Sequence, residues 1–150
     1  VPSGDCAECV SLGRPEGAIR EEIFGNLYLY RVDVSPKARN EPPLRQEQSR
    51  LGAFPMALKL HYLFTPRSDD DVTNQFMLGK ILKFVHETPV LSLPETQQTG
   101  THGDTKQFHL SFEMLTLEQM TMLWTSFGIP HCTSLPMLVD LDVNEDTIPA

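Results

Sequence analysis

Long apolar runs, basic residues and recognisable catalytic motifs are all scarce in this sequence. No stretch approaches the ~20 apolar residues that a helix needs to cross a membrane, so we expect no membrane partner. Lysine and arginine number 12 against 20 aspartates and glutamates, which gives a formal net charge of −8 at pH 7. Because contacts with phosphates require a positive surface, this balance argues against a nucleic-acid-binding protein.

The start of the sequence has neither the basic residues nor the apolar stretch of a signal peptide, so we expect an intracellular protein. Cysteine is rare as well, and an odd count of three cannot form a complete disulfide framework. Cys6 and Cys9 have the spacing of half a zinc site or of a redox pair. Only His131 and Cys132 could complete a zinc site, and adjacent residues in extended structure point in opposite directions. We therefore favour free thiols and expect no cofactor.

Catalytic motifs are missing from the sequence: it contains no G-x-S-x-G, no Walker loop, no G-x-G-x-x-G and no H-E-x-x-H. The acidic run from Asp69 to Asp71 lacks the spacing of an EF-hand loop and is typical of the first turn of a helix. Asp140 and Asp142 fit the solvated side of a strand. Nothing in the sequence supports an enzyme.

The sequence does contain a series of strand and helix patterns in the order β-β-α-β-α-β. Strands are expected at about 25–34, 56–65 and 107–114, and a last strand carries Met137 to Val143. One helix is expected to start at an N-cap serine, Ser68, and to end before Pro89; the other runs from a capping box at Thr116 to Gly128. This order predicts an α/β fold, bordering on α+β, with a mixed sheet of about four to five strands flanked by two helices.

Side-chain patterns predict which residues of these elements face inward. In the first strand, Leu27 and Leu29 should lie on one side and Tyr28, Tyr30, Val32 and Val34 on the other. A wide apolar stripe marks the first helix, with Val72, Phe76, Gly79, Leu82 and Val85 flanked by Met77, Leu78 and Ile81. Gly79 costs the helix about 1 kcal/mol relative to alanine, and we expect a neighbouring element to approach its backbone. Pro136 should place the last strand on an edge or at a bulge.

Two groups of residues are candidates for contacts with partners. The segment 35–52 is long for a loop in a compact domain, which is typical of a contact region, although a plain surface loop fits equally well. The large aromatic side chains suit either subunit interfaces or the core, and the helical stripe around Trp124 favours the core for that residue. These aromatic candidates are Tyr28, Tyr30, Tyr62 and Trp124.

Several short pieces of the sequence, taken together, resemble one known family. It is the N-terminal domain of the tail cap, or terminator, proteins of extracellular contractile injection systems of the Photorhabdus virulence cassette and antifeeding prophage type. The order and spacing of the pieces carry the resemblance over about 25–143. The pieces are Asn26 to Tyr30, Arg39-Asn40, Leu60 to Leu63, Leu78-Gly79, Thr88 to Leu91, Leu123-Trp124 and Ser134-Leu135.

The resemblance implies a phage tail-terminator-like fold and a structural role without catalysis. Such proteins are thought to form a six-membered ring on the last layer of inner tube and sheath, distal to the baseplate, which stops polymerisation. It implies sheath and tube proteins and further copies of the chain as partners, with assembly in the cytoplasm and a final place at the distal end of the particle. We expect the 35–52 loop to reach tube or sheath through Pro36, Lys37, Arg39, Asn40, Arg45 and Arg50.

The same reading divides the chain into an irregular segment at 1–24, a terminator-like domain at 25–143 and a tail at 144–150. Edge strands are expected to extend a sheet of the sheath by strand addition. Two other classes stay open: a small metal-binding or redox protein that uses Cys6, Cys9 and Cys132, and another phage-type component such as a head–tail or baseplate adaptor.

Overall fold

Strands from both ends of the sequence build one mixed sheet in a computed structural model that describes residues 9–20, 22–34, 56–93 and 106–143. The strand order is β1-β2-β3-β6-β5-β4. β1 is parallel to β2, and every other neighbouring pair is antiparallel. The bounds are β1 Val10–Leu12, β2 Gly25–Val34, β3 Met56–Pro66, α2 Asp71–Glu87, β4 Val90–Leu93, β5 Lys106–Phe112, α3 Leu117–Phe127 and β6 Leu135–Val143.

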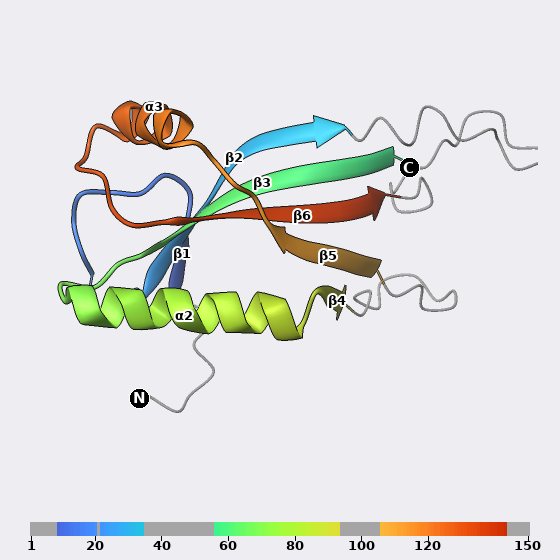
Figure 1. The fold of residues 1–150 in the computed structure, drawn as a ribbon, viewed down its shortest axis with the longest axis horizontal. Helices are drawn as coiled ribbons and strands as arrows, with labels where there is room; N and C mark the ends of the chain where they lie inside the picture. The colour runs from blue at the N-terminus through green and yellow to red at the C-terminus, as the bar shows by residue number, and fades with distance from the viewer. Residues whose placement is uncertain (1–8, 21, 35–55, 94–105, 144–150) are drawn as a thin grey trace, which may run out of the picture.

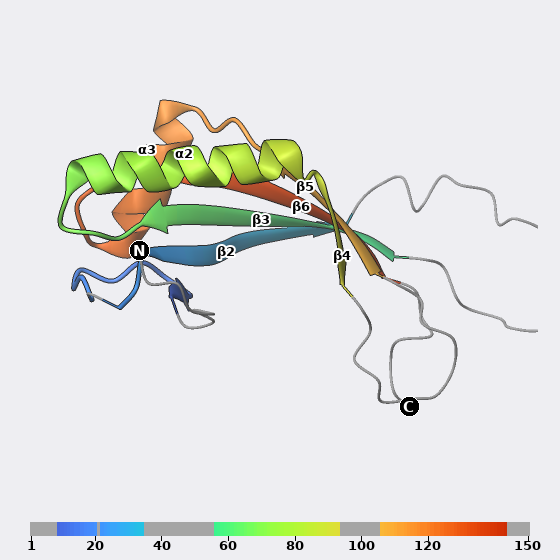
Figure 2. The ribbon, with the colours of Figure 1, turned by 90° about the horizontal axis from the view of Figure 1, so that it is seen from below.

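The two helices lie on opposite sides of the sheet, near one of its ends (Figure 1). The view from below shows α2 in front of the strands and α3 behind them (Figure 2). The opposite ends of β2, β3 and β6 extend beyond both helices in the two views. The predicted class, a mixed sheet flanked by two helices, is therefore confirmed.

The sheet has six strands in the described residues, against the four to five that we predicted. The additional ones are β1, of three residues, and β4, of four. Runs this short are too brief for an alternating pattern to be recognised in the sequence. β1 also lies inside the segment 1–24 that the sequence led us to expect to be irregular, and it is held by parallel pairing with Gly25 to Leu27 of β2.

A bulge in β2 corrects the predicted sides of that strand. Leu29 pairs with Tyr62 of β3, but the next paired residue is Arg31, opposite His61, so Tyr30 is an extra residue. Because a strand alternates with a period of two, one inserted residue reverses the side of everything after it. Val32 therefore lies on the side of Leu29, and the expectation that it shares a side with Tyr28 was wrong.

The start and the orientation of α2 differ from the prediction. Its N-cap is Asp70, whose carboxylate accepts hydrogen bonds from the backbone of residues 72 and 73, whereas the predicted cap, Ser68, lies outside the helix. Of the predicted inward stripe only Val85 is buried. The flanking residues Met77, Leu78 and Ile81 are half-buried instead. The remaining members of the stripe are exposed: Val72, Phe76, Gly79 and Leu82.

The predictions for α3 are confirmed. Thr116 and Gln119 form the expected reciprocal capping box, and Gly128 ends the helix in the left-handed conformation with φ of 70°. Trp124 is 2% exposed and is a core residue. Its indole N–H donates to the hydroxyl of Ser134, and its ring packs edge-on against Phe127 with centroids 5.1 Å apart.

β6 is a central strand between β3 and β5, but its start at Pro136 lies beyond the last residue pair with β5, Phe112↔Met137. The pairing with β3 runs without a register shift through Leu63↔Pro136. The carbonyl of Pro136 accepts from the backbone N–H of Glu113, just after β5 ends at Phe112. The missing N–H of the proline therefore falls where the β5 ladder has already finished, which is why it is tolerated near the start of the strand.

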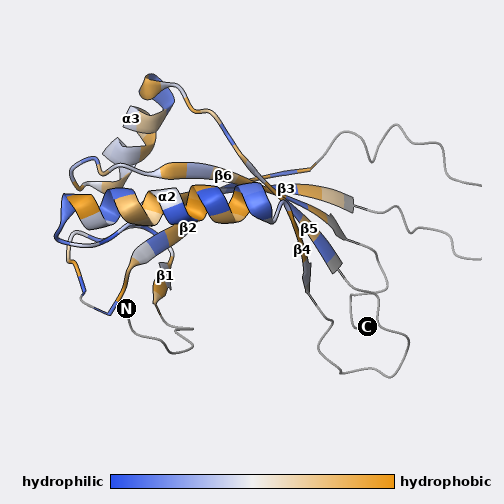
Figure 3. Ribbon diagram, turned by 60° about the horizontal axis from the view of Figure 1, so that its bottom comes forward, coloured by the Kyte–Doolittle hydropathy of each residue, from blue (hydrophilic) through white to orange (hydrophobic). Residues whose placement is uncertain are grey.

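Few large side chains are fully inside the fold. Among the described residues, the buried hydrophobic ones are Cys9, Leu63, Phe64, Val85 and Trp124. Hydrophobic residues nonetheless recur along the whole of α2 and on the strands (Figure 3), and many of them are exposed. An apolar surface of this kind is typical of a subunit that buries more area by assembling with others.

Gly25 is required for close packing at the start of β2. A Cβ at this position would lie 2.6 Å and 2.8 Å from two ring atoms of Phe64, which is 4% exposed. We expect Gly25→Ala to lower the free energy of unfolding by about 1–3 kcal/mol, the usual cost of overpacking. Urea unfolding followed by fluorescence of the single tryptophan measures this effect.

Gly17→Ala is the matched control, since its Cβ would make an ordinary contact of 3.6 Å with Ile129. It should leave stability within about 0.5 kcal/mol of the wild type. Equal midpoints for the two variants would show that the ring of Phe64 moves aside without cost.

Candidate assembly interface

The predicted loop contacts lie outside the described residues. These are Pro36, Lys37, Arg39, Asn40, Arg45 and Arg50. The points where this segment joins the fold are nevertheless defined, because β2 ends at Val34 and β3 begins at Met56 on paired neighbouring strands. Both junctions lie at the end of the sheet that extends beyond the helices (Figure 1).

The four aromatic candidates have different surroundings. Tyr28 packs edge-on against Phe127 of α3, with ring centroids 5.4 Å apart. Tyr62 is half-buried on the other side of the sheet, and Trp124 belongs to the core. Tyr30 joins a polar network described below. The structure thus brings Tyr28 and Trp124 together, because the rings of both pack against Phe127 of α3. Tyr62 lies apart from them, on the other side of the sheet.

Most of β2 forms an open edge of the sheet. β1 pairs with it only from Gly25 to Leu27, and from 28 to 34 no described strand pairs on that side. Three apolar side chains along this part are 39%, 52% and 58% exposed: Leu29, Val32 and Val34. An edge with free backbone groups and apolar side chains is a template for another strand.

A polar network joins β2, β3 and the residue after β5. His61, which is 6% exposed, lies between two carboxylates. Its Nδ1 is 2.7 Å from Glu113 Oε2, and its Nε2 is 2.9 Å from Asp33 Oδ2. The hydroxyl of Tyr30 donates to the same oxygen of Glu113 at 2.8 Å, and Arg31 Nε donates to Asp33 at 2.9 Å. The bulge makes this possible, because it moves Arg31 and Asp33 to the side of His61.

The protonation state of the network follows from its geometry and charges. Hydrogen bonding from Arg31, with a further contribution from His61, lowers the pKa of Asp33. Burial raises the pKa of Glu113, but the hydrogen bonds from His61 and Tyr30 outweigh it and the net pKa is lowered. Ionised carboxylates only accept hydrogen bonds, so a ring nitrogen of His61 that carries a hydrogen donates it to the carboxylate that it faces.

Tyr30 is held in its neutral form. Burial, followed by its hydrogen bond to Glu113, raises the pKa of its hydroxyl. The network therefore joins His61 to two carboxylates, and it cross-links three segments of the sheet. No pattern in the sequence points to this network, because the bulge that assembles its members leaves no mark in the alternation of β2.

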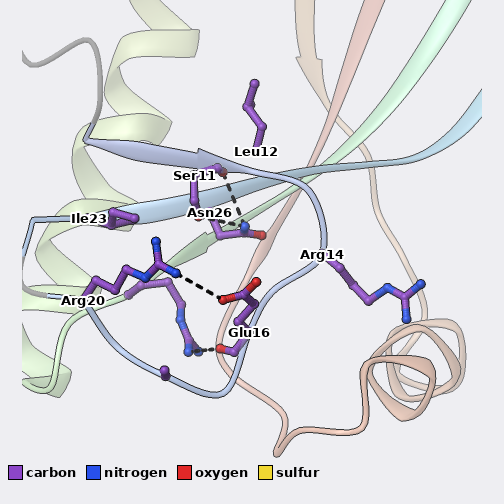
Figure 4. Close-up of a pocket in the computed structure, with 9 residues that line it drawn as sticks. Ser11, Leu12, Arg14, Glu16, Arg20, Ile23 and Asn26 are labelled. Atoms are coloured by element: carbon purple, nitrogen blue, oxygen red, sulfur yellow. Dashed lines mark hydrogen bonds and ion pairs between the residues drawn. The ribbon is translucent and has the colours of Figure 1, made fainter.

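A small cavity of about 180 Å³ lies between β1, the segment that follows it and the start of β2 (Figure 4). Two of its three basic side chains are engaged: Arg20 forms an ion pair with Glu16 at 3.9 Å, and Arg67 donates to the main-chain oxygen of the same residue. The third, Arg14, points away from the other side chains (Figure 4). The amide nitrogen of Asn26 donates to the hydroxyl of Ser11 at 3.0 Å. The cavity is thus lined by groups that stabilise the β1–β2 connection.

The two cysteines in the described part of the chain differ in their chemical state. Cys132 is a free thiol, and Arg67 donates to its sulfur at 3.6 Å. Cys9 is disulfide-bonded, so the expectation of a free thiol was wrong there, and a zinc ligand would require a thiolate. Cys6 lies outside the described residues. In the part of the chain that the structure describes, no three histidine, cysteine or acidic side chains are placed to hold a metal ion.

A family model described as the Pvc16 N-terminal domain matches residues 11–149. The chain belongs to this family. The match confirms the resemblance that we drew from the sequence, and it begins ahead of residue 25, where we placed its start. The helices described in this Pvc16 N-terminal domain are too short or too polar to cross a membrane.

One solved structure has the same fold as this Pvc16 N-terminal domain. It is the cryo-EM structure of the sheath/tube terminator of an extracellular contractile injection system, PVC, in the extended state. The likeness has a TM-score of 0.53 at 17% identity and covers 91% of this chain and 50% of that one. The Pvc16 N-terminal domain thus spans half the length of the terminator chain. Comparison with curated proteins gave no match.

Proposed function

We propose that this domain belongs to a terminator that ends the growth of inner tube and sheath at the distal end of a contractile injection particle. The observation that carries the proposal is its family membership together with the fold it shares with a sheath/tube terminator over 91% of its length. The role is architectural and not catalytic. The chain acts as a hexameric ring that assembles in the cytoplasm and stays at the tip of the particle.

The physical task of a terminator is to close an open stack. Each layer of a helical or stacked assembly presents the surface on which the next layer binds. A terminator binds that surface on one side and presents no equivalent surface on the other. The two ends of the sheet differ in the way that such a role requires. The helices lie near one end, and the long strands project from the other (Figure 1).

Two features supply the contact with the particle. The open edge of β2, with Leu29, Val32 and Val34 exposed, takes up an extended segment of a sheath subunit by strand addition. The segment 35–52 follows this edge directly and places the basic residues Lys37, Arg39, Arg45 and Arg50 next to it in the sequence. Backbone pairing gives the affinity, and the basic residues favour an acidic partner surface.

Electron microscopy of particles assembled with and without the whole protein tests the proposal. We expect overlong or ragged-ended tubes in its absence, and additional density at the distal tip in its presence. Particles of normal length with unchanged ends would overturn the proposal.

The contact itself is tested by a variant in which 37–50 is replaced by a glycine-serine segment of equal length. This variant should fold and unfold as the wild type does but should no longer copurify with particles. A second variant carrying the same replacement at 95–104, which joins β4 and β5, is the control and should copurify. Unchanged incorporation of the 37–50 variant would exclude this segment as the contact.

A further inference from the structure

The outer surface of α2 carries an apolar patch that this chain leaves uncovered. Val72 is 74% exposed and Phe76 is 64% exposed, one turn apart on the same side of the helix. They point away from the sheet, since the opposite side of the helix contains the buried Val85. Lys80 continues the row, with its ammonium 4.8 Å from the centre of the Phe76 ring. We call Val72, Phe76 and Lys80 the α2 patch.

Gly79 borders the α2 patch. The sequence led us to expect a neighbouring element close to its backbone, but in the described part of the chain a Cβ at this position would meet nothing within 4 Å, so that expectation was wrong there. A glycine in the middle of a helix is destabilising relative to alanine. A side chain of another molecule can approach the open backbone at this point.

Exposed apolar side chains also occur at the start of α3, where Leu117 and Met122 lie about 140° apart around the helix. Met114, Leu117 and Met122 are 96%, 81% and 68% exposed. The capping box of Thr116 and Gln119 fixes the backbone at this end of the helix. Glu118 lies in the first turn, and no described residue forms an ion pair with it. We call Met114, Leu117, Met122 and Glu118 the α3 patch.

The two patches are on opposite sides of the sheet and near the same end of it (Figures 1 and 2). This is the placement that a head-to-tail contact requires, because such a contact joins two different surfaces of identical subunits. The charges match as well: Lys80 borders one patch and Glu118 the other. With a net charge of −8, copies of the chain repel one another in general, so a stable contact has to pair opposite charges locally.

We propose that the α2 patch of one copy packs against the α3 patch of the next copy, with Lys80 facing Glu118, and that this contact joins the subunits of the ring. The flexible methionines of the α3 patch fill the space above Gly79 and around Phe76. The proposal rests on the terminator function only for the statement that the assembly is a ring. The contact between copies is argued from the two patches themselves.

Analytical ultracentrifugation of the full chain over a concentration series, with variants in each patch, tests the contact. Wild-type protein should form rings, whereas Phe76→Ser and Leu117→Ser should each weaken association by about tenfold or more, the effect of losing about 1.4 kcal/mol of contact energy. Phe84→Ser is the control, because Phe84 is also an exposed phenylalanine of α2 but lies about two turns further along. It should associate as the wild type does.

Mixing the two variants gives a signature specific to a head-to-tail contact. A Phe76→Ser chain keeps an intact α3 patch and a Leu117→Ser chain keeps an intact α2 patch, so an equimolar mixture should form dimers and stop there. Lys80→Glu and Glu118→Lys should each weaken association, and the double variant should restore it. All these residues are exposed, so urea unfolding of each variant should match that of the wild type.

Three results would overturn the contact: a wild-type chain that stays monomeric throughout the series, patch variants that associate normally, or a mixture that forms no dimer. These results are separate from the terminator function, which is read from the length of particles assembled with the wild-type protein. Normal rings in the patch variants together with correctly ended particles would reject the contact and keep the function.

Discussion

His61→Ala is expected to lower the free energy of unfolding by about 1–3 kcal/mol, the usual cost of leaving hydrogen-bonding groups without their buried partner. The ring nitrogens of His61 lie 2.7 Å from Glu113 and 2.9 Å from Asp33. Without the ring, both carboxylates lose this partner and face the cavity that it leaves. We expect a loss near the lower end of this range, because the side chains of Glu113 and Asp33 are 26% and 35% exposed. They also keep their hydrogen bonds from Tyr30 and Arg31.

The dependence of this loss on pH distinguishes charge from cavity formation. The pKa of Asp33 is lowered by Arg31 and His61, and that of Glu113 is lowered because hydrogen bonds outweigh burial. A carboxyl group whose pKa is lowered in the folded state stabilises the fold at pH values above its ordinary pKa, which is 3.8 for Asp33 and 4.5 for Glu113. This stabilisation is lost as the pH falls through the lowered pKa. The difference between wild type and His61→Ala should therefore be full above pH 4.5 and should shrink below pH 3.8.

Urea unfolding at a series of pH values, followed by tryptophan fluorescence, measures this difference. His109→Ala is the matched control: His109 is exposed on β5, and the same substitution there should change stability by less than about 0.5 kcal/mol. A loss at His61 that is the same at every pH would show that packing, and not the ion pairs, accounts for it.

Trp124→Ala should have the largest effect of all, a loss of about 3–5 kcal/mol. Trp124 is one of the few large side chains that are fully buried in the described residues, and it ties α3 to the segment before β6. Its ring packs on Phe127 and on His131, with centroids 5.1 Å and 5.3 Å away, and its N–H reaches Ser134. A domain at the lower end of ordinary stability, about 5 kcal/mol, would be left close to its unfolding midpoint.

Two companion variants separate the contributions of Trp124. Trp124→Phe keeps much of the packing but removes the hydrogen bond and should cost about 1–2 kcal/mol. Thr125→Ala, next to it on the exposed side of α3, should stay within about 0.5 kcal/mol. Circular dichroism is the measurement here, because the chain has one tryptophan. Equal unfolding midpoints for Trp124→Ala and Thr125→Ala would mean that the packing of α3 does not depend on the side chain of Trp124.

Local signals in the sequence identified the elements that depend on local chemistry. The capping box at Thr116, the glycine stop at Gly128 and the strand at 25–34 all appear in the structure. Most of the predictions that were wrong concern features decided by distant residues. Which side of α2 faces the sheet depends on where the sheet lies, so a helix with apolar residues on both sides could not be oriented from its own sequence.

The predictions for the candidate interfaces also divide into those decided by local spacing and those decided by distant residues. Burial of Trp124 followed from the spacing of its helix, whereas the bulge at Tyr30 follows from pairing with β3 and has no sequence signature in β2. The network around His61 depends on that bulge and on Glu113, which is far along the chain. Gly79 led to a wrong expectation, because in the described residues nothing lies within 4 Å of a Cβ at this position.

The central position of β6 has a consequence for how the protein is made. β1, β2 and β3 form one half of the sheet and β4 and β5 the other, and the halves are joined only when β6 inserts between β3 and β5. On the ribosome, both halves therefore wait for residues 135–143. Pairings between strands so distant in sequence form slowly, in about milliseconds to seconds. The nascent chain thus exposes the edges of β3 and β5 until β6 has been synthesised, and this is the stage at which a chaperone would have the most to protect.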